Sequence, residues 1–440
     1  MNLSYSNLYK HTAYQAKISP NGHYIANGLD NRLVIRDHSK DLTVLMVYET
    51  PKPVDYVAWS PNSEYILTCN YEAGRIDIRS TIDTNWHGII KEGRISMTKV
   101  SWSFDSKKVL YITELKLMLG IWDLSTSELT YVNHIKYAEK GIETSPDGNC
   151  VAVARKDSGK DYISIYHGGS FTQLEHFEVG TVDMQNLKWS PDGIYIAIWD
   201  SCLYHNLLVY RQDGTLCVNY SGYENGLGIK TVCWSPNGLL LAIGNYDQTI
   251  HLLSTKDWKL VSILNHPTTI TSSMNMKILD EVIPAQNTGL DQQKKEADYQ
   301  ILTKRPYNIH TLRAEYNQPN PKVGIGLCQF SMDSSYICSR NDNTPNILWT
   351  WKVKSLQCHT IVKFKHPIRQ ALWNPLEEHM LVVICGDEKT RYLQPTEDEG
   401  MDIISFSVPI PDFSIKKSKW NSNGDSLILM DTNLFCLAVM

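Results

Sequence analysis

The stretches Trp189-Ser190-Pro191-Asp192-Gly193 and Trp234-Ser235-Pro236-Asn237-Gly238 decide the fold of this 440-residue chain. Pro presets the backbone for the first central position of a tight turn, Asp or Asn bonds its own backbone, and Gly accepts a positive φ. The chain therefore reverses direction at each copy. Apolar residues alternate beside the turns, as at Leu239, Leu241 and Ile243. This alternation predicts that each turn joins two antiparallel strands.

The same turn returns nine times along the chain. Its Ser, or the equivalent Asn, stands at positions 19, 60, 103, 145, 190, 235, 331, 374 and 421. The steps between copies are about 41 to 47 residues, except for one of about 96. A period in the low forties with this turn is typical of WD-repeat propellers, in which each repeat is one four-stranded sheet. Ile121-Trp122-Asp123 retains the Trp-Asp pair that names these repeats.

The two ends of the chain predict how the last sheet is completed. The ninth repeat supplies strands near 415–420, 426–430 and 434–439, and Leu3 to Tyr9 leave room for one more strand before the first turn. We therefore expect the N-terminal strand to complete the last blade, which removes exposed sheet edges. The prediction is an all-β WD-repeat propeller in which residues 1–440 form a single closed ring. It has about nine blades of four antiparallel strands, or eight blades and one degenerate element.

The one irregular step marks an insertion. Residues 268–321 separate the sixth repeat from the seventh, and Asn287 to Glu296 within them is polar and predicted to be disordered. The residues that follow alternate apolar positions with Pro, so they could lie as an extended strand across the propeller. The insertion is either a tolerated surface loop or a partner-binding element, because long loops in compact domains are often functional. In the second case it would emerge on the face where partners dock.

Candidate partner-binding residues come from the insertion and from the repeat after it. Arg and Tyr are common anchors of protein interfaces because they bring large contact areas and directional hydrogen bonds. The candidates are Tyr299, Tyr307 and Tyr316 in the insertion and Arg340, Asn341, Asp342 and Asn343 in the seventh repeat. The alternative for the second group is an inner turn held by Asn and Asp side chains. The residue pattern leaves both interpretations open.

Several other residues are predicted to be structural. His266 and His366, each followed by Pro, occupy the place where WD repeats carry a His that bonds a turn Asp, and Asp387 is the expected partner of His366. The ten Cys are scattered and predicted to be reduced core residues. Six Trp directly precede the repeated turn and are expected to pack between blades. These are Trp59, Trp102, Trp189, Trp234, Trp373 and Trp420.

Composition and motifs argue against catalysis, nucleic acid and membranes. The formal net charge of -5 gives no global attraction to nucleic acid or anionic lipid. The longest apolar run, Leu239 to Ile243, is too short to span a bilayer, and the N-terminus lacks a leader. Gly226-Leu227-Gly228 and Gly324-Ile325-Gly326 lack the third Gly and the helix of a dinucleotide loop. We therefore expect no enzyme activity, no cofactor, no metal and no small-molecule substrate.

Three segments outside the turns carry a more specific resemblance. They are Tyr223-Glu224 with Leu227-Gly228-Ile229-Lys230, Asn320-Pro321-Lys322-Val323-Gly324-Ile325-Gly326, and Arg340-Asn341-Asp342-Asn343 with Pro345-Asn346. In this order, and over nearly the whole chain, they resemble the centrosomal and spindle-pole family called WD repeat-containing protein eight.

The resemblance implies a non-catalytic adaptor in the cytoplasm and cytoskeleton, at the centrosome or spindle pole body. Such an adaptor binds a coiled-coil anchoring protein and, in fungi, a minus-end-directed kinesin, and it helps to anchor microtubule minus ends and organise the mitotic spindle. A rigid disc can hold several partners and raise the effective concentration of one near another. The alternative is a cytosolic scaffold of an RNA-processing or translation-initiation complex, against which the mildly acidic charge argues.

Overall fold

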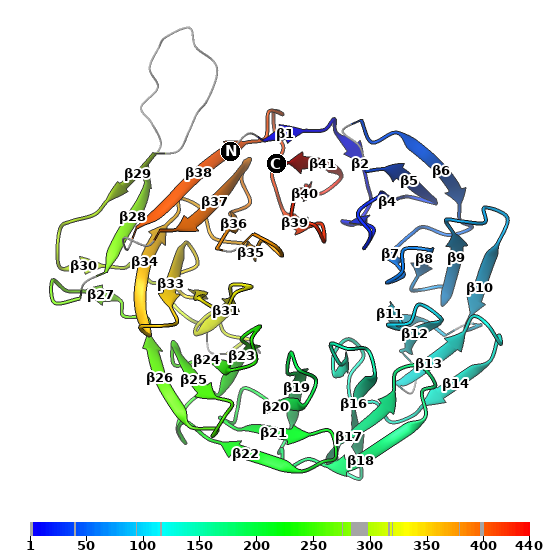
Figure 1. Ribbon diagram of the computed structural model, residues 1–440, viewed down its shortest axis with the longest axis horizontal. Helices are drawn as coiled ribbons and strands as arrows, with labels where there is room; N and C mark the ends of the chain where they lie inside the picture. The colour runs from blue at the N-terminus through cyan, green and yellow to red at the C-terminus, as the bar shows by residue number, and fades with distance from the viewer. Residues whose placement is uncertain are drawn as a thin grey trace, which may run out of the picture. The chain divides into compact units, whose positions relative to one another are not determined.

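The computed structural model describes residues 3–38, 41–93, 95–114, 117–274, 276–282, 298–315, 317–318, 320–377, 379–396 and 400–440. These residues form strands and turns and contain no helix. The strands build nine sheets of at least four strands and one small two-stranded sheet (Figure 1). The fold is an all-β WD-repeat propeller with nine blades, as the sequence predicts. By contacts the chain divides into two compact units, residues 1–200 with 207–220 and 421–440, and residues 201–206 with 221–420.

The first five blades are antiparallel sheets whose strands follow one another in chain order. Blade one contains β3 (Ala16–Ile18), β4 (Tyr24–Leu29), β5 (Arg32–Asp37) and β6 (Val44–Glu49), and blade two contains β7 (Tyr56–Trp59), β8 (Tyr65–Asn70), β9 (Arg75–Ser80) and β10 (His87–Lys91). Blade three contains β11 (Met97–Trp102), β12 (Lys108–Thr113), β13 (Met118–Asp123) and β14 (Leu129–Val132). Blade four contains β15 (Ile142–Thr144), β16 (Cys150–Asp157), β17 (Lys160–His167) and β18 (Gln173–Glu178), and blade five contains β19 (Met184–Trp189), β20 (Tyr195–Asp200), β21 (Leu207–Arg211) and β22 (Leu216–Tyr220).

The later blades follow the same order. Blade six contains β23 (Ile229–Trp234), β24 (Leu240–Asn245), β25 (Thr249–Ser254) and β26 (Leu260–Asn265), and the core of blade seven contains β31 (Ile325–Phe330), β32 (Tyr336–Asn341), β33 (Ile347–Lys352) and β34 (Gln357–Lys363). Blade eight contains β35 (Gln370–Trp373), β36 (Leu381–Ile384), β37 (Lys389–Pro395) and β38 (Met401–Ser407). The last sheet contains β39 (Lys417–Trp420), β40 (Ser426–Met430) and β41 (Leu434–Val439).

The N-terminus completes the last sheet. β1 (Ser4–Tyr5) pairs antiparallel with β41, so that Ser4 lies opposite Val439, and β2 (Tyr9–Lys10) pairs with the other end of β41. Between them the Ser6 hydroxyl accepts the backbone N–H of Leu437 at 2.9 Å. The prediction that the N-terminus completes the last blade is therefore confirmed, with two short strands in place of one.

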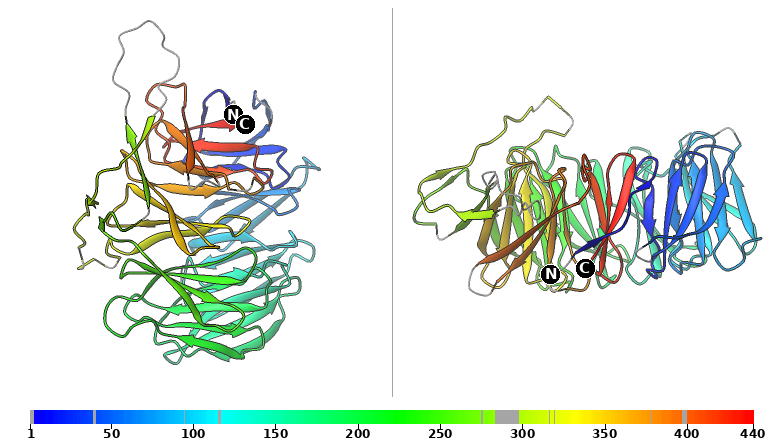
Figure 2. Two further views of the ribbon diagram at one scale, coloured as in Figure 1. Left: turned by 60° about the vertical axis from the view of Figure 1, so that its left-hand side comes forward. Right: turned by 90° about the horizontal axis from the view of Figure 1, so that it is seen from above.

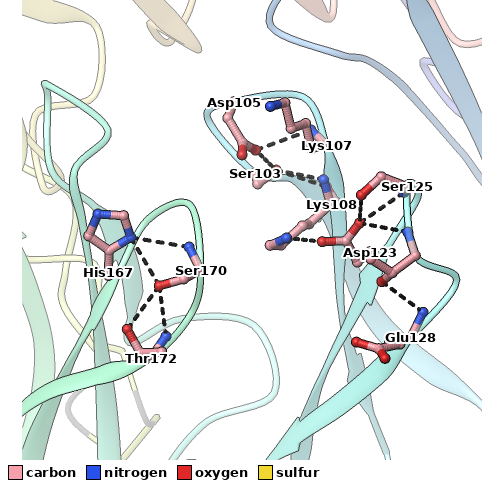
Figure 3. Close-up of polar contacts among 11 residues, drawn as sticks. Ser103, Asp105, Lys107, Lys108, Asp123, Ser125, Glu128, His167, Ser170 and Thr172 are labelled. Atoms are coloured by element: carbon pink, nitrogen blue, oxygen red, sulfur yellow. Dashed lines mark hydrogen bonds and ion pairs between the residues drawn. The ribbon is translucent and has the colours of Figure 1, made fainter.

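Ser103 in blade three shows how the repeated turn is built (Figure 3). Its hydroxyl donates to the Asp105 carboxylate at 2.5 Å and accepts the N–H of Lys108 at 2.9 Å, while Asp105 accepts the N–H of Lys107 at 3.1 Å. The sequence pattern assigned this work to Asp or Asn alone, whereas a buried Ser hydroxyl is the centre of the turn. The same Ser bonds recur at Ser19, Ser60, Ser145, Ser190, Ser235 and Ser331.

At several repeats the Trp before the turn links neighbouring blades. The indole N–H of Trp59 donates to the carbonyl of Lys17 at 3.0 Å, and that of Trp189 donates to the carbonyl of Glu143 at 3.0 Å. Five of the six predicted core Trp are buried, and Trp102 is half-buried. At Trp59 and Trp189 the side chain therefore supplies both buried area and a donor that reaches the preceding blade.

Three turns carry Ser at the left-handed position where other copies carry Gly. The backbone angle φ is 63° at Ser63, 62° at Ser106 and 65° at Ser334. Each hydroxyl accepts a backbone N–H from the turn of the preceding blade, at 3.0, 3.0 and 3.1 Å. A hydrogen bond between blades thus offsets the strain of a left-handed residue that has a side chain.

The insertion extends blade seven outward. β28 (Lys277–Val282) pairs in parallel with β34, and β29 (Asp298–Ile301) pairs antiparallel with β28, so this sheet has six strands (Figures 1 and 2). β27 (Thr269–Ile270) and β30 (Tyr307–Asn308) form the separate two-stranded sheet. The described part of the insertion is thus neither a plain surface loop nor a strand laid across the propeller. The segment Asn287 to Glu296, predicted to be disordered, lies outside the described residues.

Apolar side chains of the insertion belong to the core of this region. Ile270 and Ile278 are fully buried and pack in the same cluster as Ile250 of blade six and Trp349 of blade seven. Burying such side chains stabilises the folded state by about 1.5 to 3 kcal/mol each. The insertion is therefore a structural part of the unit that contains it.

Candidate partner-binding surface

Lys230 joins the three segments that carry the family resemblance. Its ammonium donates to the carbonyls of Pro321 at 3.1 Å and Val323 at 2.8 Å, and it lies 2.8 Å from the Asp342 carboxylate. Only 7% of the Lys230 side chain is exposed. A buried ammonium with three oxygen partners fixes the start of β23, the approach to β31 and the turn after β32 in one place.

Asp342 is shared between two cations. Its other carboxylate oxygen lies 2.6 Å from the guanidinium of Arg340, which also donates to the carbonyl of Ile368 at 2.6 Å. A Cβ at Gly326 would lie 2.0 Å from this carboxylate oxygen, so only Gly leaves room for it. Arg340 and Asp342, predicted partner anchors, are 18% and 19% exposed and form an ion-pair network with Lys230.

Asn341 and Asn343 are buried, which corrects their assignment as partner contacts. Both side-chain amides donate to the Gln248 side-chain oxygen of blade six, at 2.8 and 3.2 Å. The Gln248 carbonyl in turn lies 3.0 Å from His266 Nδ1, and His266 Nε2 lies 2.8 Å from the Ser339 hydroxyl. Burial lowers the pKa of His266 to about 3, so its ring is neutral. The inner-turn interpretation describes this segment.

The Tyr residues of the insertion serve its attachment. The Tyr299 hydroxyl lies 3.5 Å from a Glu281 carboxylate oxygen and 3.5 Å from the Ser405 hydroxyl, and burial raises its pKa. Tyr307 is half-buried against the core shared by blades six and seven. Tyr316 lies outside the described residues. Tyr299 and Tyr307 therefore contact other residues than Arg340 does, which bonds Asp342 and Ile368.

The hydrogen bonds that the structure gives Asp387 come from Arg391, while His366 acts on Asp387 through its charge, which helps to lower the pKa of that carboxyl. His366 is exposed, and the two hydrogen bonds from Arg391 are 2.6 and 3.0 Å long. The planar guanidinium matches a carboxylate with two parallel donors, which a single imidazole nitrogen cannot do. A signal was present in the sequence, because Arg391 stands four positions after Asp387.

Arg391 also binds a residue of the insertion that sequence analysis missed. Its Nε lies 2.7 Å from Glu281 Oε1, and these two side chains are 1% and 2% exposed. The second Glu281 oxygen accepts the backbone N–H of Lys365 at 2.9 Å. The ion pair ties β28, the strand that the insertion adds to blade seven, to β37 of blade eight. No sequence motif marks Glu281, because its partner is far along the chain.

A hollow of about 380 Å³ borders the Lys230 network. The Tyr246 ring forms one wall, with the Lys230 ammonium 4.8 Å from its centre, and its hydroxyl donates to the Asn320 side chain at 3.1 Å. Aromatic, aliphatic and acidic groups together suit a side chain of a protein partner. The lining residues are Tyr223, Asn225, Gly226, Leu227, Tyr246, Asp247 and Val323.

The remaining candidate groups for chemistry are metal ligands and thiols. Within the described ranges, no three His, Cys, Asp or Glu side chains are placed to hold a metal ion. All ten cysteines are free thiols, and burial raises the pKa of Cys338 and Cys385 to about 12, which makes them poor nucleophiles. In the part of the chain that the structure describes, no helix has the length and apolar character to cross a membrane.

Comparisons with known proteins give both a family and a fold. A model described as the WD40 domain of anaphase-promoting complex subunit 4 matches residues 187–277. The WD repeat-containing protein WRAP73 of Mus musculus is 31% identical over 452 residues, which cover 100% of this chain and 96% of the mouse protein. An uncharacterized WD repeat-containing protein of Schizosaccharomyces pombe is 24% identical over 429 residues, covering 92% of this chain and 85% of the yeast protein.

Solved structures agree on the fold. The Dos1 propeller has a TM-score of 0.56 at 11% identity, covering 99% of this chain and 95% of that one. The C-terminal WD40 domain of Sif2 has a TM-score of 0.52 at 13% identity, covering 88% and 95%. At these sequence identities the similarity shows the fold alone.

Proposed function

Because this chain belongs to the WRAP73 family of WD repeat-containing proteins, we propose that it is a non-catalytic adaptor of the centrosome or spindle pole body. At the coarser level it is a WD-repeat scaffold for protein interactions. In the proposed role it binds a coiled-coil anchoring protein, helps to anchor microtubule minus ends and organises the mitotic spindle. A minus-end-directed kinesin is the further partner proposed for fungal members.

The convergence around Lys230 is the observation that carries this proposal. The fold needs the repeated turns, the Trp contacts and the apolar strands, yet the three segments of the resemblance lie outside those turns. They meet through the contacts of Lys230 with Val323 and Asp342, and the first two of them line the hollow at Tyr246. Specific residues gathered at a surface hollow, outside the repeated pattern, support a binding role.

The hollow fits the chemistry of a coiled coil. A coiled-coil helix presents apolar side chains beside charged ones, and a groove receives it through a few apolar anchors. Leu227 and Tyr246 offer apolar contact, and Asp247 offers a charge for a Lys or Arg of the partner. We therefore assign the anchoring protein to this surface.

Leu227→Asp tests this surface, with Leu239→Asp as the matched control on the same blade. Leu227 lines the hollow, and Leu239 is 62% exposed at the repeated turn of blade six. A fluorescently tagged chain should concentrate at spindle poles through mitosis. Leu227→Asp should disperse it, because a carboxylate in the hollow opposes docking of an apolar side chain, while Leu239→Asp should stay at the poles.

Two results would contradict the proposal. A wild-type chain that never concentrates at poles, and instead follows ribosomes or RNA granules, would favour the cytosolic RNA scaffold. A wild-type chain at the poles whose Leu227→Asp variant is folded and equally localised would keep the function and reject this surface.

A further inference from the structure

A second hollow of about 460 Å³ lies on blade seven, where the insertion joins it. Three lysines and no carboxylate line it, in a chain whose formal net charge is -5. A locally positive hollow on a negatively charged protein attracts anions in preference to other ligands. The lining residues are Lys277, Lys352, Lys354, Ser355, Gln357, Cys358 and His359.

The insertion creates this hollow. Lys277 is the first residue of β28 and pairs with Thr360 of β34, which follows His359 directly. Lys352 ends β33, and Lys354 lies in the turn that leads into β34. Without β28, the outer edge of β34 would be open, and one of the three ammonium groups would be missing. The positive hollow is thus a property of the six-stranded blade.

The polar residues that line this hollow beside the lysines include no acid. Lys352 and Lys354 form no ion pair with any residue that the structure describes. The His359 ring is held by the Thr360 hydroxyl at 3.0 Å and lies 3.4 Å from the Thr396 carbonyl. Burial raises the pKa of Cys358, so its thiol is neutral. Ser355 and Gln357 supply uncharged hydrogen-bond donors beside the lysines.

A neighbouring hollow of about 450 Å³ shares Lys352 and Lys354 with the first. Tyr336, Val353 and Pro395 give it apolar wall area, and Asp333 and His379 add polar groups. The two hollows together form a basic groove, with the lysine cluster at one end and a mixed surface at the other. Such a groove has room for more than a single small anion.

We propose that the basic groove binds a phosphorylated peptide segment of a protein partner. The phosphoryl group, with a charge near -2 and three acceptor oxygens, lies among Lys277, Lys352 and Lys354, and adjacent peptide residues lie along the second hollow. Three lysines that line one hollow suit a compact dianion better than spaced carboxylates. The inference rests on the proposed function only in that a scaffold binds protein segments.

Oriented peptide libraries provide the test on the purified full chain. One library carries a fixed phosphoserine between randomised positions, and its control carries Ser at the same position. The phosphoserine library should bind at least about tenfold more tightly by fluorescence anisotropy, and K352E/K354E should lose at least about tenfold. K417E/K419E is the matched control, because Lys417 and Lys419 are exposed, equally spaced and change the charge identically. It should bind like wild type.

Three outcomes would overturn the groove. They are equal binding of the two libraries, equal losses in the two double variants, and displacement of the phosphopeptides by oligouridine as effective as by phosphoserine peptide. The last would favour RNA. Since Lys352 is half-buried, the single variant K354E, at an exposed position, checks that any loss is not unfolding. The tagged K352E/K354E variant also separates this proposal from the proposed function. Loss of phosphopeptide binding with unchanged localisation at the poles concerns the groove alone, and a wild-type chain that is absent from the poles concerns the proposed function alone.

Discussion

Blade three and blade seven satisfy their buried polar groups in different ways. In blade three, Ser103 bonds Asp105 and Lys108, and Lys108 pairs with Asp123, all within one short stretch of chain (Figure 3). In the extended blade seven, Glu281 pairs with Arg391, which is 110 positions away. The Ser hydrogen bonds of the turn recur wherever the motif recurs. The arrangement in blade seven exists once and depends on the whole surrounding unit.

The same difference between local and distant partners is seen when two buried glutamates are compared. Glu281 is paired with a guanidinium. Glu143 of blade four lies in a hollow of about 220 Å³ walled by Leu110 and Ile112, and its carboxylate accepts the backbone N–H of Trp189 at 2.9 Å. Burial raises the pKa of Glu143 to about 7. A regular repeat can thus bury an acid that has no guanidinium partner, because burial favours the protonated, neutral form of the carboxyl.

The largest effect is expected from breaking the ion pair of the insertion. Arg391→Met leaves Glu281 and Asp387 buried without their cation, so we expect a loss of about 3 to 5 kcal/mol in the free energy of unfolding, measured by urea titration. Adding Glu281→Met should restore part of it. Arg32→Met is the control, because that pair with Glu49 is 60% and 78% exposed. Its loss should be below about 1 kcal/mol, and an equal loss would contradict the comparison.

The pH dependence of Glu143 gives the next effect. A carboxyl whose pKa is raised on folding binds more protons in the native state, so stability is greatest below the unfolded pKa and falls as pH rises to about 7. Between pH values well below the unfolded pKa and well above 7, this group changes the free energy of unfolding by about 3 kcal/mol. Glu143→Gln should remove this slope and be more stable than wild type at pH 8 in urea titrations. Glu49→Gln, at an exposed site, should keep the slope. An unchanged slope in Glu143→Gln would reject the assignment.

The smallest effect concerns the hydrogen bond between the turns of blades one and two. Ser63→Ala keeps a side chain at φ 63° but removes the acceptor for the Asn21 N–H, so we expect a loss of about 1 kcal/mol. Ser63→Gly loses the same bond but relieves the left-handed strain, which is worth about 1 kcal/mol. It should be close to neutral in thermal unfolding. A Gly variant less stable than the Ala variant would show that the left-handed backbone at this position carries no strain.

What the sequence predicts well is whatever repeats locally. The turns at Ser190 and Ser235, the Trp before them and the count of nine blades all rest on contacts within one repeat or between neighbouring repeats. The exchange of β1 onto β41 follows from counting strands at the two ends. Even here the Ser hydroxyl as the centre of the turn was missed, because Pro, Asp and Gly dominate the usual rules for turns.

What the sequence does not predict is pairing between distant segments. Nothing local in Lys277–Val282 indicates a parallel partner, and β28 finds one in β34 only after blade seven has formed. For the same reason the sequence does not predict Arg391 as the donor to Asp387. Its other partner, Glu281, comes from the insertion, far away along the chain. Asn341 and Asn343 looked like exposed anchors, but Gln248 of the neighbouring blade buries them. The basic groove draws on stretches that only the fold brings together.

The pairing of Val282 with Asp298 has a practical consequence for engineering. Because β28 and β29 hold the two ends of the intervening segment side by side, its length is almost free to change, and each doubling adds only about 0.6 kcal/mol of closure entropy. A reporter domain with neighbouring termini, grafted between residues 283 and 297, would therefore leave every blade in register.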